Sequence, residues 1–233
     1  MSTLPPAAIL TSVEGATTPP GFPRDVLAPF FRARLPELVG GAEGDPAVAA
    51  ALDEVARMVP GQPVLTTLLH WVDQGAATAP LQSLQDRVWQ DLFARHPPDT
   101  AIYADVPACL RLWARMGLRL YAFSTVPAEV ARLVLGRAPA GDLAGLFAGF
   151  FDPRVGGRRD PDSYIRLAIG MNVPTVEVLF LSAVEAELDA AAVAGMRTCQ
   201  VLRPLAGLVA SERHPVAADF PAVARALGLP IPR

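Results

Sequence analysis

The chain has 233 residues, of which 52% are hydrophobic and 18% charged, enough apolar material for one substantial domain with an inserted subdomain. Its 23 acidic and 20 basic side chains give a formal net charge of −3 with no basic stripe, which argues against a nucleic-acid partner. All the basic residues are arginine, so chemistry that needs a lysine amine is excluded.

The two cysteines, Cys109 and Cys199, lie far apart in apolar segments. This spacing fits neither a zinc site nor a disulfide framework, so we expect buried, inert thiols. No apolar run reaches the length of a membrane span, and the N-terminus lacks a signal pattern. We therefore expect a cytoplasmic protein without a membrane partner.

The N-terminal part of the chain predicts one strand followed by helices. The run "AAIL" at 7–10 is typical of a short buried strand, and the polar loop "TSVEGATTPP" follows it. Helical spacing then begins at Arg24, where Pro29 and Pro36 are expected to kink or split the first helix. Three more helical segments, each punctuated by Pro or Gly, complete an all-helical block over 19–97.

From about residue 102 the pattern alternates between helices and strands, which predicts a parallel sheet covered by helices. The expected strands are "LRLYAFS" at 118–124, "GFFD" at 149–152, "VEVLFLS" at 176–182 and "RTCQVLR" at 197–203. In such sheets the carboxyl ends of the strands form the ligand crevice. Ser12, Ser124 and Ser182 stand at predicted strand ends, so the sequence places three polar side chains along one rim.

Short motifs in a fixed order resemble the haloacid dehalogenase-like hydrolases, and most closely the enolase-phosphatases (acireductone synthases). They are "SVEGATTPPGF" at 12–22, "RDVL" at 24–27, "LQDRVW" at 84–89, "FSTVP" at 123–127, "GGRRDPDSY" at 156–164, "LFLSAVEAELDAA" at 179–191 and "VLRP" at 201–204. The resemblance implies an α/β fold with a Rossmann-like parallel sheet. Its core is expected at 1–18 and 98–233, with a helical cap inserted at 19–97.

The departures from this family's pattern concern its chemistry. The family has a nucleophilic aspartate where this chain has Ser12, and a second, Mg²⁺-binding aspartate where it has Ala183. The family's phosphate-neutralising lysine is Arg158 here, and the glycine of its phosphate loop is Val126. Since Mg²⁺ usually takes carboxylates plus substrate phosphate, we expect no metal, no other cofactor and no ordinary phosphatase turnover.

The residues that remain favour acid–base chemistry on a small molecule that contains a carbonyl group. Glu14 is the candidate general acid or base, and Ser12 lines the pocket as a hydrogen-bond donor. Arg158 is expected to bind an anionic or enolate oxygen without a metal. The other expected substrate-binding residues are Thr17, Thr18, Ser124, Thr125, Ser182 and, from the cap, His70. Enolisation, isomerisation, cyclisation or elimination, in a biosynthetic setting, would all fit.

These residues also allow other interpretations. Glu14 could instead cap the following turn or pair with Arg158, and Thr17 and Thr18 could serve mainly to cap the backbone. His96 and His214, each before a proline, read as exposed loop residues. A noncatalytic protein that binds a metabolite is the second functional hypothesis, and a residual phosphatase is the third. The sequence does not indicate the oligomeric state.

Overall fold

A computed structural model describes residues 5–76, 78–95, 102–204 and 208–232, and the side chains of 90–95 are not described. The chain forms two compact units, one made of residues 1–20 and 99–233 and the other of residues 21–98. No helix within the described ranges is long and apolar enough to cross a membrane.

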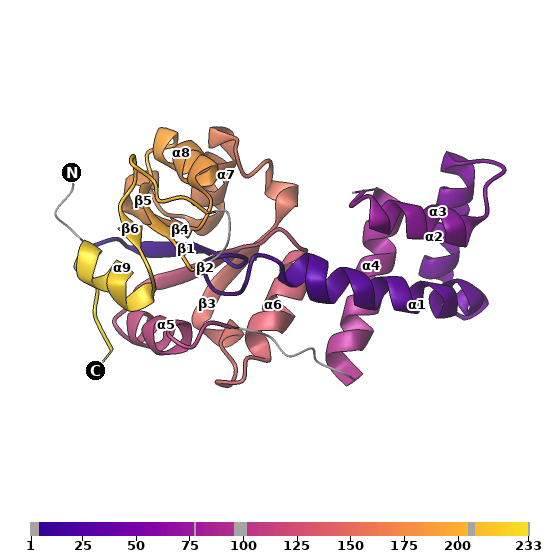
Figure 1. The fold of residues 1–233 in the computed structure, drawn as a ribbon, viewed down its shortest axis with the longest axis horizontal. Coiled ribbons are helices and arrows are strands. Elements are labelled where there is room, and N and C mark those ends of the chain that lie inside the picture. Colours follow the sequence, from indigo (N-terminus) through magenta and orange to yellow (C-terminus); the bar gives the residue numbers. More distant parts are fainter. Residues whose placement is uncertain (1–4, 77, 96–101, 205–207, 233) are drawn as a thin grey trace. The chain divides into compact units, whose positions relative to one another are not determined.

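The first unit is built on a parallel sheet of six strands in the order β3-β2-β1-β4-β5-β6 (Figure 1). The strands are β1 (Ala8–Ser12), β2 (Arg119–Phe123), β3 (Phe147–Phe151), β4 (Val178–Ser182), β5 (Arg197–Val201) and β6 (Val216–Ala217). Every described pairing is parallel, so the carboxyl ends of all the strands lie at one edge. The predicted α/β class with a parallel sheet is confirmed.

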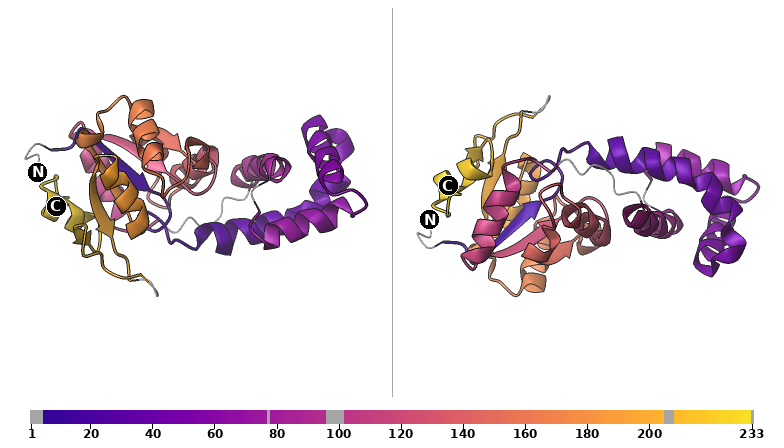
Figure 2. Two further views of the ribbon diagram at one scale, coloured as in Figure 1. Left: turned by 90° about the horizontal axis from the view of Figure 1, so that it is seen from above. Right: turned by 90° about the horizontal axis from the view of Figure 1, so that it is seen from below.

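Helices cover both faces of this sheet, as the further views in Figure 2 show. They are α5 (Val106–Arg115), α6 (Ala128–Gly136), α7 (Pro161–Met171), α8 (Glu185–Val193) and α9 (Phe220–Leu227). Side chains alternate along each strand, so Ile9 packs with α5 and α9 on one face and Leu10 with α7 and α8 on the other. All five residues of β1 are buried, which explains its uninterrupted apolar start.

The second unit holds α1 (Ala28–Gly40), α2 (Pro46–Met58), α3 (Val64–Asp73) and α4 (Ala79–Arg95), and a π-helical turn, Pro23–Leu27, precedes α1. Its core includes Phe31, whose ring centroid lies 5.8 Å from that of Trp89. Pro29 stands in the first turn of α1, directly after the π-helical turn. Pro36 does not split the helix as one expectation had it, because α1 runs through this residue.

The sequence-based description of the sheet also needs correction near its ends. Residues 176–177 belong to a 3-10 turn, Thr175–Glu177, and not to the strand predicted at 176–182. Strand β6 and helix α9 were not anticipated, since a two-residue strand has no detectable period and prolines surround both elements. Cys109 and Cys199 are fully buried as predicted, and burial raises the pKa of each thiol to about 12.

Candidate active site

Glu14 lies two residues beyond β1, and both of its carboxylate oxygens accept hydrogen bonds from the loop after β2. The Ser124 hydroxyl donates to Oε1 at 2.5 Å, and the Thr125 backbone N–H donates to Oε2 at 2.9 Å. Ser124 Oγ itself accepts from the N–H of Val126 at 3.1 Å. The Glu14 residue is only 8% exposed. Its carboxylate is therefore fixed in orientation at the carboxyl edge of the sheet.

The turn that carries Glu14 is closed by its own hydroxyl groups. Thr17 Oγ1 and Thr18 Oγ1 both donate to the carbonyl oxygen of Val13, at 2.6 and 3.2 Å. Gly15 has a φ of +87°, which favours glycine. A Cβ there would lie 2.9 Å from the Ala183 methyl group, so the turn packs directly on the loop after β4. Thr17 and Thr18 thus fold the turn, and their hydroxyl hydrogens point to backbone.

Arg158 forms the second polar centre at this edge. Its Nε and Nη2 donate to the two oxygens of Glu187 at 2.8 and 2.9 Å. Nη2 also donates to Ser12 Oγ at 2.6 Å, and Ser12 donates in turn to the backbone carbonyl of Glu14 at 3.0 Å. The guanidinium carbon lies 4.2 Å from the centre of the Phe123 ring. Arg158 therefore connects the ends of β1 and β2 with α8.

Arg158 carries its charge in an environment that is mostly closed to water, with its side chain 12% exposed. Burial works against this charge, but the hydrogen bonds and charge of Glu187, with the charge of Glu14, outweigh burial and raise the pKa of Arg158 above its ordinary value. Nη1 is buried and has no hydrogen-bond partner among the described residues. A permanent cation thus stands beside Ser12.

Ser182, at the end of β4, bonds to the carboxylate of Glu187, which in turn pairs with Arg158. Its hydroxyl donates to Glu187 Oε2 at 2.7 Å and accepts from the N–H of Val184 at 3.1 Å. Glu187 lies in the first turn of α8, where a carboxylate is favoured by the helix dipole. Reasoning from the sequence did not select Glu187 as a site residue. The signal present in the sequence was an acidic residue in the first turn of a helix that follows a strand ending in serine.

The residues at this edge do not fit a magnesium ion. Mg²⁺ requires near-octahedral oxygen coordination, usually with carboxylates. Ser12 contributes a neutral hydroxyl that Arg158 and the Glu14 carbonyl already engage, and Ala183 contributes a methyl group. The carboxylates of Glu14 and Glu187 already accept hydrogen bonds from internal donors on both oxygens. Within the described ranges, no group of three His, Cys, Asp or Glu side chains is placed to hold a metal.

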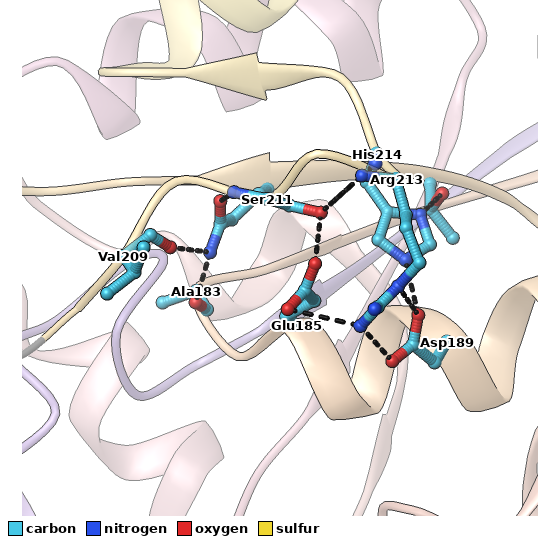
Figure 3. A network of polar contacts seen from close by, with 9 residues as sticks. Ala183, Glu185, Asp189, Val209, Ser211, Arg213 and His214 are labelled. Atoms are coloured by element: carbon cyan, nitrogen blue, oxygen red, sulfur yellow. Dashed lines mark hydrogen bonds and ion pairs between the residues drawn. The ribbon is translucent and has the colours of Figure 1, made fainter.

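The backbone of Ala183 belongs to a polar network with residues of α8 and the segment 209–214 (Figure 3), which Gln200 of β5 joins. The Gln200 amide donates to the carbonyls of Ala183 and Val209 at 3.1 and 3.0 Å. In the same network His214 bonds Asp189 and Thr198, at 3.0 and 2.8 Å. The His214 side chain is only 6% exposed, so the expectation of an exposed loop histidine is wrong. His96 lies outside the described residues.

The structure brings most of the predicted site residues together within the first unit. Glu14, Ser124 and the backbone of Thr125 form one cluster, while Ser12, Arg158 and Ser182 meet in the other through Glu187. Glu14 and Arg158 are not hydrogen-bonded to each other. Glu14 bonds to Ser124 and Thr125, and Arg158 bonds to Glu187 and Ser12. His70 is an exposed residue of α3 in the second unit, so its role toward substrate stays a prediction.

Asp152, directly after β3, stabilises the neighbouring loop and gives a testable pH dependence. Burial raises its pKa, but hydrogen bonds from Arg154 and from the backbone of Ala128 and Arg154 outweigh burial, so the pKa lies below the ordinary 3.8. The charged form therefore stabilises the fold above about pH 4, and this contribution disappears as the pH falls through the lowered pKa.

We expect Asp152→Asn to lower the free energy of unfolding at pH 7 by roughly 1–2 kcal/mol, because one buried charged acceptor of several hydrogen bonds is lost. The difference from the parent should shrink as the pH falls from about 4 through the lowered pKa, because the unfolded chain takes up its proton before the folded one does. Urea unfolding at pH 7 and pH 3 measures both values. An equal difference at both pH values would contradict this account.

Comparison with known proteins places these observations in a family. No protein-family model matches the chain. Enolase-phosphatase E1 of Acidiphilium cryptum is 44% identical over 97% of this chain and 98% of its own length. The protein of the same name from Granulibacter bethesdensis is 42% identical, with coverage of 98% and 99%.

Solved structures agree with this assignment. The UTR4 protein of Saccharomyces cerevisiae superposes with a TM-score of 0.79 at 26% identity, covering 92% of this chain and 98% of its own. A 2-haloacid dehalogenase from Pseudomonas syringae, at 17% identity and a TM-score of 0.59, shares the fold over 95% and 97% of the two chains. The chain belongs to the enolase-phosphatase E1 family, on the haloacid dehalogenase-like fold.

Proposed function

We propose that this chain is an enzyme that retains proton transfer next to a carbonyl group and has lost phosphoryl transfer. The name of its relatives joins an enolase with a phosphatase activity. The observation that carries the proposal is the arrangement of Ser12. Arg158 donates to the Ser12 oxygen, and the Ser12 hydroxyl donates to the Glu14 backbone carbonyl, so no side chain among the described residues accepts its proton as a base would. Ser12 is therefore not expected to form a covalent bond to phosphate.

Glu14 is the proposed base. Its carboxylate would remove a proton from the carbon next to the carbonyl, and the electron pair of the broken C–H bond would move onto the carbonyl oxygen to form an enolate. The protonated Glu14 would then return the proton to oxygen or to a neighbouring carbon. The hydrogen bonds from Ser124 and Thr125 keep the carboxylate oriented, which is the main structural requirement for such a transfer.

Arg158 supplies the positive charge that this reaction needs. The enolate oxygen develops a negative charge, which a fixed cation in a poorly hydrated site stabilises strongly. Arg158 is protonated at neutral pH, because an arginine titrates far above it and neighbouring carboxylates raise its pKa further. In this proposal it serves as a resident cation, and the reaction requires no divalent metal ion.

Deuterium incorporation tests the proposal without knowledge of the natural product. The protein is incubated in D₂O with a panel of diketones and excess EDTA, and exchange next to the carbonyl is followed by NMR. We expect exchange that Mg²⁺ does not accelerate, and no inorganic phosphate from a phosphorylated diketone. Exchange that vanishes with EDTA and returns with Mg²⁺ would overturn the metal-independent mechanism.

A noncatalytic metabolite-binding protein is the second candidate. It is favoured by the same bonds that orient Glu14, because a carboxylate with both oxygens engaged is also a stable structural link. In that case a diketone would shift the melting temperature of the protein but would show no exchange. The NMR assay and a thermal-shift titration on the same panel separate the two functions.

A further inference from the structure

The motif "VLRP" at 201–204 has no role in the proposed chemistry, yet its arginine is among the most enclosed charged residues of the chain. Arg203 is 5% exposed. Its Nη1 and Nη2 donate to the two oxygens of Asp105 at 2.7 and 3.1 Å. The guanidinium carbon lies 4.1 Å from the centre of the Tyr103 ring. Such a paired, stacked guanidinium is rigid, since Arg presents a planar fork.

Arg203 also reaches the turn that carries Glu14. Its Nη2 donates to the carbonyl oxygen of Ala16 at 2.9 Å, and the backbone N–H of Tyr103 donates to the carbonyl of Thr17 at 3.0 Å. Tyr103, before α5, and Arg203, two residues beyond β5, thus bond to two successive carbonyls of the turn. Glu14 is tied from the opposite side by Ser124 and Thr125.

We propose that Arg203 is a positioning residue for Glu14, and this inference rests on the proposed role of Glu14 as the base. Asp105 fixes the guanidinium, because it also accepts from the N–H of Phe220 at 2.9 Å at the start of α9. The turn is therefore bound on one side by Arg203 and Tyr103 and on the other by Ser124 and Thr125. Without the bond to Ala16, the turn would lose its contact with Arg203 and keep others, among them those to Phe123, Ser124, Thr125 and Tyr103.

Two variants separate positioning from folding. Arg203→Lys keeps a charge for Asp105 but cannot serve both Asp105 and Ala16 with a planar fork. Arg203→Met combined with Asp105→Asn removes both charges together, so no buried carboxylate is left unpaired. Arg213→Met is the control. It removes an exposed arginine that pairs with Asp189 and Glu185 of α8 (Figure 3).

The first measurement is amide hydrogen exchange of the peptide 13–20, whose N–H groups of Gly15, Thr17 and Thr18 bond within the turn. The second is deuterium incorporation into the diketone that the parent exchanges fastest. Both Arg203 variants should show faster amide exchange at 13–20 and a kcat about 10–100-fold lower, with KM little changed, because a displaced base affects the chemical step. The control should match the parent.

A Glu14→Gln background tests the link between the two residues. There the Arg203 variants should cause no further loss of kcat, since the base is already absent. If the variants fold and leave exchange at 13–20 or kcat unchanged, Arg203 does not position Glu14. If neither variant folds, Arg203 is a general stability residue and the proposal is wrong. If Glu14→Gln itself keeps full activity, the proposed base fails, whatever amide exchange shows for the turn.

Discussion

Restoring three residues should give this chain magnesium-dependent phosphatase activity. In the triple variant Ser12→Asp, Ala183→Asp and Arg158→Lys, we expect phosphate release from a phosphorylated diketone to rise at least ~10²-fold over the parent. Removing a catalytic nucleophile typically costs roughly 10⁴–10⁶-fold, and imperfect geometry should recover only part of that factor. Colorimetric phosphate release with and without Mg²⁺ measures the gain.

All three changes are needed for a physical reason. An aspartate at position 12 alone would pair with Arg158, whose Nη2 already lies 2.6 Å from Ser12 Oγ. A lysine at 158 gives a single point charge in place of the fork, and an aspartate at 183 adds the second carboxylate that Mg²⁺ requires. Ser12→Asp alone should therefore remain inactive as a phosphatase.

The matched control has asparagine at positions 12 and 183 together with Arg158→Lys, which reproduces the side-chain volumes without the charges. It should release no phosphate above the parent level. Equal activity of the aspartate and asparagine versions would show that the added carboxylates do not recreate a metal site. Phosphatase activity in the unmodified chain, dependent on Mg²⁺, would contradict the explanation based on Ser12 and Ala183 directly.

The order of strands and helices in the sheet unit could be predicted because its periodicities are strong. β1 and β4 begin with apolar runs and are buried along their whole length, and the serines that end them mark the edge where a site can form. The departures at Ser12 and Ala183 were indicated by the family that the motifs resemble, which has an aspartate at each position. The strand ends thus indicated where a site can lie, and the resemblance indicated which residues differ there.

The partners of the retained residues could not be predicted, because they depend on contacts between distant segments. Arg158 is 29 residues from Glu187 and 146 from Ser12, and only the assembled sheet brings the three together. The Arg203 contact with Ala16 spans 187 residues and leaves no local signal. His214 was misjudged for the same reason, since its burial comes from α8 and β5 and not from its own loop.

Glu14→Gln is expected to reduce deuterium incorporation into a diketone by about 10²–10⁴-fold, the usual contribution of a general base. The substitution preserves shape and leaves an amide oxygen to accept from the Thr125 N–H, so the fold should persist. Exchange rates by NMR, with the melting temperature measured in parallel, give the result. Glu129→Gln, an exposed glutamate in the first turn of α6, is the matched control and should leave the rate unchanged.

The size of the Glu14→Gln effect decides whether Glu14 is the base or only a structural link. A base that transfers the proton cannot be replaced by an amide, whereas a carboxylate that only links two loops can be replaced at a modest cost in stability. An unchanged exchange rate would remove Glu14 from the chemistry while leaving its structural role intact. Loss of exchange with an intact fold would support Glu14 as the base, with Arg158, bonded to Glu187 and Ser12, as the neighbouring cation.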